Sequence, residues 1–206
     1  MVKWCIALLL LTGVAFAGNL GVDFTSPGSQ AASSVWNLGY SFTANTNATV
    51  VGLGAFDYNQ DGFAQAQQVG LWNVTTGGLV ASSYVDNTDA LTGYWRFRGI
   101  TPVTLVAGDT YIVGSQGGEG YTWFVTGMTV APEITFLQDA YYYLGNSSNN
   151  PLFEPDTSDG FGQGVGGGFF GGNIEFGTAT PEPGTLALAG PGLLGLIGLA
   201  RRKFRA

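Results

Sequence analysis

Apolar and polar residues alternate through the middle of this chain. Between Val35 and Thr43, for example, one face of the pattern consists of Trp36, Leu38, Tyr40 and Phe42. Successive side chains of a β-strand point to opposite faces of the sheet, so a period of two residues predicts a strand. Outside one ambiguous segment, no long amphipathic helix is expected in this region. The pattern therefore predicts an all-β domain.

Similar alternation predicts further strands, which Gly-rich and Asp-containing turns separate. In the second strand the pattern puts Val51, Leu53 and Ala55 together, and Thr75–Gly78 has the composition of a hairpin turn. The further predicted strands are Thr49–Phe56, Gln68–Val74, Leu79–Val85, Tyr94–Ile100, Thr110–Gly114, Tyr121–Val125 and Asn173–Phe176. Turns at a spacing of roughly 8–12 residues favour an antiparallel β-sandwich, jelly-roll-like, with a barrel as the alternative.

Two segments near the end of this domain are less regular. Ile134–Leu144 fits either a helix, with an apolar face, or a strand, because of its aromatic residues. Residues 160–172 contain eight glycines in thirteen positions, which is typical of a flexible connector or a long loop. Because a strand-like segment follows, we expect a loop between the last two strands, and we place the domain at residues 18–180.

The N-terminus has the three parts of a secretory signal peptide at residues 1–17. Lys3 is followed by the uncharged, largely apolar run Trp4–Val14, and Ala15-Phe16-Ala17 has the small residues that signal peptidase requires. We expect cleavage after Ala17, and a retained anchor is the alternative. The single cysteine, Cys5, lies inside this signal, so the mature protein is expected to have neither a disulfide nor a thiol nucleophile.

The C-terminal segment, residues 181–206, has the features of a membrane-targeted tail. Pro181, Glu182 and Pro183 interrupt regular structure, and residues 184–200 carry no charge. Seventeen such residues lie at the short end of a transmembrane helix. The basic residues that follow are Arg201, Arg202, Lys203 and Arg205. By the positive-inside rule they place the end of the tail in the cytoplasm, at the inner membrane, with the domain outside.

This tail resembles the PEP-CTERM sorting signal of Gram-negative bacteria. The resemblance rests on the segment from Pro181 to Leu188, the Leu- and Gly-rich span that follows, and the terminal basic cluster. It implies cleavage by a membrane-embedded exosortase near the Pro-Glu-Pro motif. It also implies delivery to the cell surface or extracellular matrix, in bacteria that make exopolysaccharide for a biofilm. A plain membrane anchor that is never cut is the alternative.

The central domain is similar to the DUF4082 group, β-sandwich domains of unknown function that recur in surface proteins. The similarity covers residues 36–114, and its main segments are Gly52–Asp57, Asp61–Gly62, Val69–Trp72 and Pro102–Gly114. It implies a sandwich fold and an extracellular setting. It transfers no catalytic residue.

The charge of the predicted domain restricts its partners. From Gly18 to Thr180 the only basic residues are Arg96 and Arg98, against 13 carboxylates, which gives a net charge of −11. Binding to nucleic-acid phosphates requires clustered Lys and Arg, so nucleic acid is excluded. Cations, neutral glycans and basic partners remain open.

The residue types present also restrict catalysis. The chain has no His, and the predicted mature domain has no Cys or Lys, which excludes Ser-His-Asp, Cys-His, Schiff-base and common zinc chemistry. A glycosidase-type carboxylate pair is the remaining alternative, a secreted glycan-active enzyme, and its candidates are Glu119, Glu133, Glu154 and Glu175. We expect no enzymatic activity.

Asp57, Asn59 and Asp61, followed by Gly62, have the spacing of a calcium-binding loop. The position at which an EF-hand loop has its bidentate Glu is Gln68, so further ligands would have to come from residues such as Glu154, Asp156 or Asp159. The alternative is a tight turn in which Asp and Asn cap their own backbone.

Aromatic residues are the remaining candidates for binding. Exposed aromatic rings stack on the apolar faces of sugars, which suits a matrix polysaccharide as the partner. We nevertheless expect most of the four tryptophans of the domain, Trp36, Trp72, Trp95 and Trp123, in the core, because each ring buries a large area. We expect Tyr141, Tyr142 and Tyr143 to form the exposed aromatic patch. The sequence predicts an exported, non-catalytic structural or binding protein.

Overall fold

The structure of the protein is a computed structural model that describes residues 19–32, 35–116, 120–143, 154–155 and 168–177. The predicted signal peptide, the predicted transmembrane helix and the rest of the sorting tail lie outside these residues. Within the part of the chain that is described, no helix combines the length and the apolar character needed to cross a membrane.

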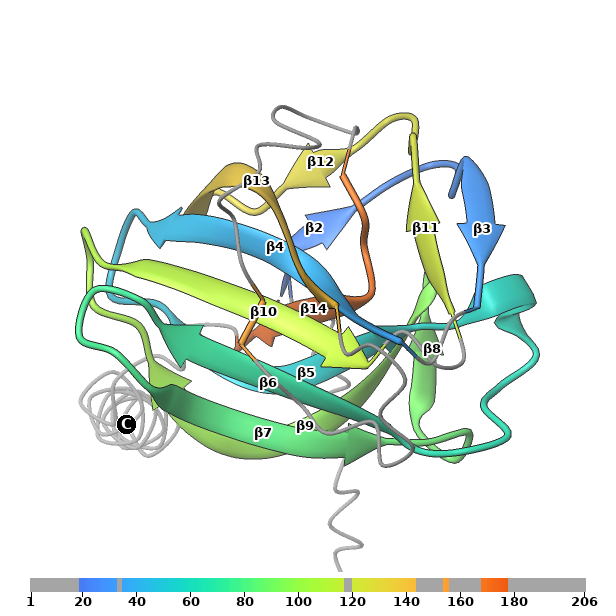
Figure 1. Cartoon of the computed structure of the whole chain (residues 1–206). Coiled ribbons are helices and arrows are strands. Elements are labelled where there is room, and N and C mark those ends of the chain that lie inside the picture. Colours follow the sequence, from blue (N-terminus) through green and yellow to red (C-terminus); the bar gives the residue numbers. More distant parts are fainter. Residues whose placement is uncertain (1–18, 33–34, 117–119, 144–153, 156–167, 178–206) are drawn as a thin grey trace, which may run out of the picture.

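Two five-stranded sheets make up most of the fold (Figure 1). The first sheet has the order β1 (Asn19–Leu20), β14 (Gly172–Phe176), β5 (Thr49–Phe56), β9 (Trp95–Thr104) and β8 (Ala90–Thr92). The second sheet has the order β13 (Ile134–Tyr143), β4 (Trp36–Ala44), β10 (Thr110–Gln116), β6 (Gln67–Asn73) and β7 (Leu79–Val85). Every strand pairing in both sheets is antiparallel. The prediction of an all-β, antiparallel fold is therefore confirmed.

Smaller elements complete the fold at one end of these sheets. Two short ribbons pair β11 (Tyr121–Trp123) with β3 (Ser29–Ala31), and β12 (Thr129–Val130) with β2 (Val22–Asp23). A single 3-10 turn, η1 (Tyr58–Gln60), follows β5.

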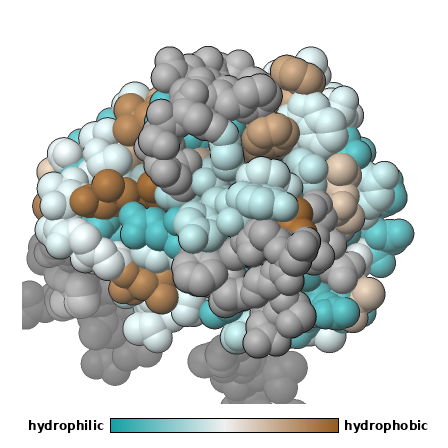
Figure 2. Space-filling view, viewed as in Figure 1, coloured by the Kyte–Doolittle hydropathy of each residue, from teal (hydrophilic) through white to brown (hydrophobic). Residues whose placement is uncertain are grey.

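One hydrophobic core lies between the two sheets. Tyr40 and Phe42 of β4 and Val113 of β10 belong to the same buried cluster as Leu53 of β5 and Trp95 of β9. The alternation that predicted these strands therefore identified the side chains that fill the space between the sheets. Figure 2 shows the surface of the molecule in the orientation of Figure 1. On this surface, separate hydrophobic patches lie among weakly polar residues.

Most predicted strands are present, and the ambiguous segment is resolved as a strand. The Thr75–Gly78 turn joins β6 to β7, with φ of 79° at Gly77 and 106° at Gly78. The segment from Ile134 forms β13, because its backbone pairs with β4 along the whole of that strand. The predicted last strand is β14, so β13 and β14 flank the Gly-rich region.

Two details of the predicted strands are wrong. Val50, not Val51, faces the core beside Leu53, since a β-bulge between Val50 and Gly52 shifts the alternation by one residue. The strand predicted from Tyr121 to Val125 ends at Trp123, because Phe124 has a φ of 54°, outside the extended region.

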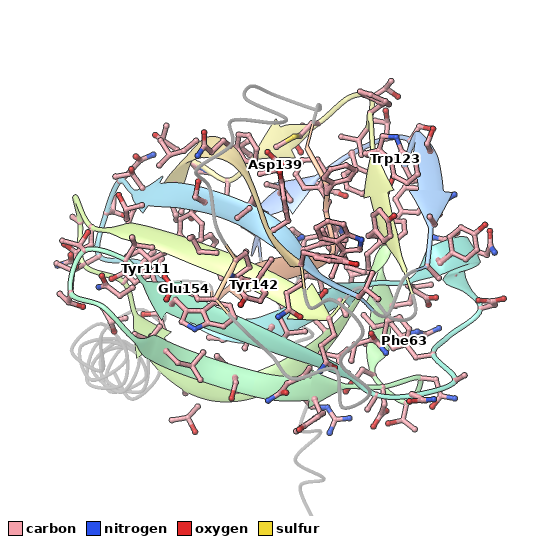
Figure 3. The ribbon with its side chains drawn as sticks, in the orientation of Figure 1. Phe63, Tyr111, Trp123, Asp139, Tyr142 and Glu154 are labelled. Atoms are coloured by element: carbon pink, nitrogen blue, oxygen red, sulfur yellow. The ribbon has the colours of Figure 1, made fainter. Side chains whose placement is uncertain are left out.

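A row of small residues crosses the outer face of the second sheet, a feature not predicted from the sequence. The paired positions are Ala140, Gly39, Gly114, Gly70 and Ser82, one on each strand. Pro155 lies in this row, so close that a Cβ atom at Gly114 would be 2.6 Å from its Cγ. Glu154 lies over the same sheet (Figure 3), and burial raises the pKa of its carboxyl group. The chain thus covers part of this face itself.

Candidate functional site

An aromatic pocket lies at the edge of the core, between the paired strands β4 and β13 and the segments that carry Tyr121 and Phe169. Its volume is about 310 Å³, and its lining consists of Trp36, Leu38, Tyr121, Tyr141 and Phe169. This volume is at the lower end of the range for small-ligand sites, which are mostly apolar and aromatic. We refer to these five residues as the aromatic pocket.

Strand register places the floor of the aromatic pocket. Leu38 of β4 pairs with Tyr141 of β13, and Trp36 pairs with Tyr143. Paired residues of antiparallel strands project from the same face, and Tyr40 and Phe42 continue this face into the core. The floor is therefore the end of the core-facing surface of the second sheet.

The opposite wall comes from two other segments. Tyr121 lies on β11, and Phe169 precedes β14. Backbone hydrogen bonds in both directions between Thr122 and Phe170 hold these segments together, at 3.1 and 2.8 Å. Phe170 is buried in the core, and its neighbour Phe169 contributes to the pocket. The backbone N–H of Phe169 donates to Oδ2 of the buried Asp139 at 3.4 Å, which ties this segment to β13.

The rings around the pocket meet at varied angles. Tyr121 stacks on Trp123 at a centroid distance of 5.5 Å and an interplanar angle of 29°, and Trp123 itself is not among the residues that line the pocket. Tyr141 meets Trp36 at 79° and Phe169 at 84°, edge to face. The rings therefore surround a space and do not form a single flat strip.

A buried hydroxyl lies next to the pocket floor. Ser115 of β10 pairs with Leu38 and so projects from the same face of the sheet. The residue is 1% exposed, and its Oγ has no hydrogen-bond partner among the residues that the structure describes. An unpaired buried hydroxyl costs free energy, so a ligand or water that reaches it would be stabilised there.

Only one of the four tryptophans lies in the core between the two sheets. Trp95 is fully buried there. Trp72 is 5% exposed but belongs to a separate buried cluster with Ile112 and Ala140 on the outer face of the second sheet. Trp36 and Trp123 are only partly buried and belong to the ring cluster just described. The expectation that most of the four lie in the core is therefore wrong.

The tyrosine run is exposed in part. Tyr142 and Tyr143 are 40% and 57% exposed, whereas Tyr141 is partly buried in the pocket. Strand alternation separates them, because Tyr142 pairs with Asn37 and points to the outer face. Leu38, Tyr121 and Phe169 were not singled out from the sequence. The adjacent pair Phe169-Phe170 inside the Gly-rich segment was the signal in the sequence that could have identified Phe169.

The predicted calcium loop forms a tight turn organised by Asp57. The Asp57 carboxylate is fully buried and accepts the Gly62 N–H at 3.1 and 3.2 Å. It also forms an ion pair with Arg96 Nε at 2.7 Å. Asn59 has a φ of 63°, a left-handed conformation common for Asn in turns, and Asp61 is exposed.

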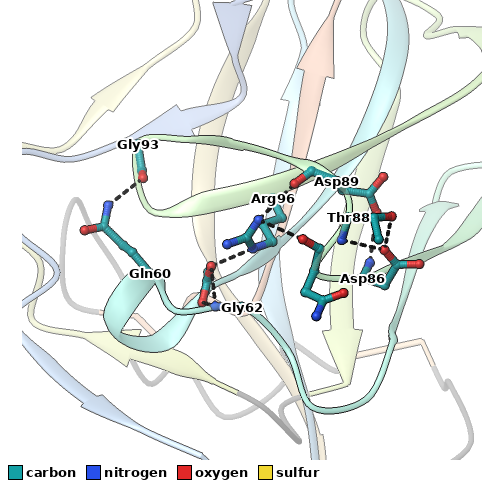
Figure 4. A network of polar contacts seen from close by, with 9 residues as sticks. Gln60, Gly62, Asp86, Thr88, Asp89, Gly93 and Arg96 are labelled. Atoms are coloured by element: carbon teal, nitrogen blue, oxygen red, sulfur yellow. Dashed lines mark hydrogen bonds and ion pairs between the residues drawn. The ribbon is translucent and has the colours of Figure 1, made fainter.

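Arg96 extends this turn into a network with the β7–β8 loop (Figure 4), and Arg98 adds ion pairs to the same loop. Arg96 Nη1 donates to the carbonyl oxygens of Asn87 and Asp89, at 3.3 and 3.0 Å. Arg98 pairs with Asp86 and Asp89, at 2.8 and 2.6 Å. Hydrogen bonds from Thr88, with a further contribution from Arg98, lower the pKa of Asp86. Both basic residues of the domain are thus engaged internally.

This geometry favours the turn over a cation site at Asp57. The guanidinium of Arg96 already neutralises the carboxylate, and a divalent cation there would meet that positive charge. Among the described residues, no group of three or more acidic, His or Cys side chains gathers as a metal site. Of the proposed additional ligands, Glu154 lies at the outer face of the second sheet, and Asp156 and Asp159 lie outside the described residues.

We therefore expect calcium to leave the thermal stability of the protein unchanged. A ligand that binds only the folded state raises the melting temperature, and the rise grows with the logarithm of the ligand concentration above its Kd. Melting scans in 5 mM EDTA and in excess CaCl₂, at about equal ionic strength, measure this directly. A midpoint that rises with calcium and returns with EDTA would instead establish the cation site, and Asp61→Asn would then remove the rise.

The carboxylates considered for catalysis lie on different elements. Glu133 accepts a hydrogen bond from Asn19 at 3.4 Å, and Glu175 lies on β14 beside Gly52. Glu154 lies at the outer face of the second sheet, and Glu119 is outside the described residues. None of the described ones lines the aromatic pocket.

Comparison with known proteins identifies the C-terminal tail. Residues 179–203 match the PEP-CTERM protein-sorting motif, which includes Pro181, Glu182, Pro183 and the basic residues up to Lys203. The chain is thus an exported protein with a C-terminal, membrane-directed sorting signal of the kind that exosortase processes. No curated protein matches the chain significantly.

Proposed function

We propose that this protein is a non-catalytic polysaccharide-binding protein displayed at the cell surface or in the extracellular matrix. The aromatic pocket carries this proposal, because four aromatic rings enclose a space suited to the apolar face of a sugar. The sorting motif supports the location. The residue types present support the absence of catalysis, since the described candidate carboxylates lie away from the pocket.

We further propose that residues 18–180 form a jelly-roll-like β-sandwich related to the DUF4082 group. The shared core of the two sheets supports a sandwich. The chain also passes from one sheet to the other between β4 and β5, β5 and β6, β7 and β8, β9 and β10, and β13 and β14. Such repeated crossing is typical of Greek-key sandwiches.

Binding is tested with a pair of adjacent tyrosines. We expect Tyr141→Ala to abolish retention of the purified domain in polysaccharide-containing native gels, because this ring forms part of the pocket floor. Tyr142→Ala is the matched control, since Tyr142 points to the opposite face of the same strand. Equal retention of both variants would contradict the pocket as the binding site. Release of reducing ends during incubation would favour the glycan-active enzyme instead.

The processing steps are tested by mass spectrometry of the protein recovered from its host. We expect Gly18 as the first residue and loss of the chain beyond the Pro181–Pro183 motif. Replacement of Pro181, Glu182 and Pro183 by alanine should leave the tail attached and the protein in the membrane fraction. An intact C-terminus in the secreted wild-type protein would contradict sorting with cleavage.

A further inference from the structure

We infer that the aromatic pocket selects an uncharged sugar residue and rejects uronic acids and sulfated sugars. This inference rests on the proposed function and specifies its ligand class. Its first basis is the lining of the pocket, four aromatic residues and one leucine, which offers no cation to pair with a carboxylate or sulfate. Recognition of such groups normally uses the planar fork of Arg or the ammonium of Lys.

The domain has no other cation to supply. Arg96 is held by Asp57 at 2.7 Å, and Arg98 by Asp86 and Asp89 at 2.8 and 2.6 Å. Between Gly18 and Thr180 these are the only basic residues. A bound anionic sugar would therefore lose its hydration without gaining a counter-charge, which is strongly unfavourable.

The net charge of residues 18–180 also disfavours the binding of anionic sugars. At −11, the predicted mature domain repels a polyanion before contact, whereas a neutral chain meets no such barrier. This long-range effect is screened by salt, but the missing counter-charge inside the pocket is not. Salt dependence therefore separates the two contributions.

The shape of the pocket indicates that it holds a single ring. A long segment of a polysaccharide binds best to a flat row of coplanar rings. In this pocket, Tyr141 instead meets Trp36 and Phe169 edge to face. Ser115 is a neutral polar residue on the same sheet face as Leu38, and its buried Oγ has no hydrogen-bond partner among the described residues. A neutral group is the natural partner for a neutral hydroxyl.

The test compares each acidic polymer with its own carboxyl-reduced form, so that only the charge differs. The probes are polygalacturonate and hyaluronan, each native and carboxyl-reduced, in affinity electrophoresis with the wild-type domain and with the Tyr141→Ala and Tyr142→Ala variants. We expect at least about tenfold stronger retention by the reduced member of a pair, persisting at about 0.5 M NaCl. We expect Tyr141→Ala to lose this retention and Tyr142→Ala to keep it.

The outcomes separate this inference from the proposed function. Equal or stronger retention by a native uronate polymer, lost in Tyr141→Ala, would overturn the selectivity and leave polysaccharide binding in place. If the selectivity disappears in high salt, it arises from the net charge of the domain. That result would overturn the role of the pocket in selectivity. Retention of the wild-type domain by no polymer of either pair would sink both proposals.

Discussion

Replacing Asp57 by alanine is expected to lower the free energy of unfolding by about 3–5 kcal/mol. The carboxylate is fully buried, and its partner Arg96 has a side chain that is only 14% exposed. Without Asp57, the guanidinium remains largely buried with no opposite charge, and the Gly62 N–H loses its acceptor. Urea denaturation followed by tryptophan fluorescence measures the difference.

Two further variants distinguish the loss of a buried pair from a general effect of altering the network. Asp86→Ala removes a carboxylate from the exposed pair with Arg98 and should cost far less, because solvent screens that pair. The double variant Asp57→Ala/Arg96→Met should recover part of the loss, since it leaves no unpaired charge. Equal losses in Asp57→Ala and Asp86→Ala would contradict a structural role specific to the Asp57 turn.

This turn also shows where the sequence was insufficient. The spacing of Asp57, Asn59 and Asp61 fits both a cation loop and a self-capped turn, and no local pattern decides between them. The deciding residue is Arg96, which lies 39 positions away in sequence and reaches Asp57 only through the pairing of β5 with β9. Knowledge of which strands are neighbours was therefore required.

Local periodicity was sufficient for most of the fold. Alternation depends only on adjacent residues, so β4, β5, β6 and β7 could be predicted with nearly their observed bounds. It failed at Val51, where a bulge shifts the faces, and at the two- and three-residue strands such as β1 and β8, which are too short to show a period.

The aromatic pocket could be predicted from the sequence only in part. Trp36 and the tyrosine run were recognised as aromatic candidates from the sequence alone. Their assembly with Tyr121 and Phe169 depends on the β13–β4 register and on the backbone bridge between Thr122 and Phe170. The composition could therefore indicate that the site is aromatic, but not which residues form it.

Replacing Trp95 by alanine is the second large expected effect, a loss of about 3–5 kcal/mol in the free energy of unfolding. The ring is fully buried and contacts Phe24 and Phe56 at centroid distances of 5.7 and 5.8 Å. Its removal leaves a cavity between the two sheets. Because the core is closely packed, the neighbouring side chains cannot fill this cavity unless both sheets move. Urea denaturation of the variant measures the loss as a lower midpoint.

Trp36→Ala provides the matched comparison, because this ring is partly exposed and lines the pocket. It should lower the unfolding midpoint much less than Trp95→Ala but remove polysaccharide retention. Trp95→Ala, assayed at a temperature where it is still folded, should keep that retention. If Trp36→Ala were instead as destabilising as Trp95→Ala, the aromatic residues of the pocket would be an extension of the core. The two tryptophans thus test whether stability and binding depend on separate sets of aromatic residues in one domain.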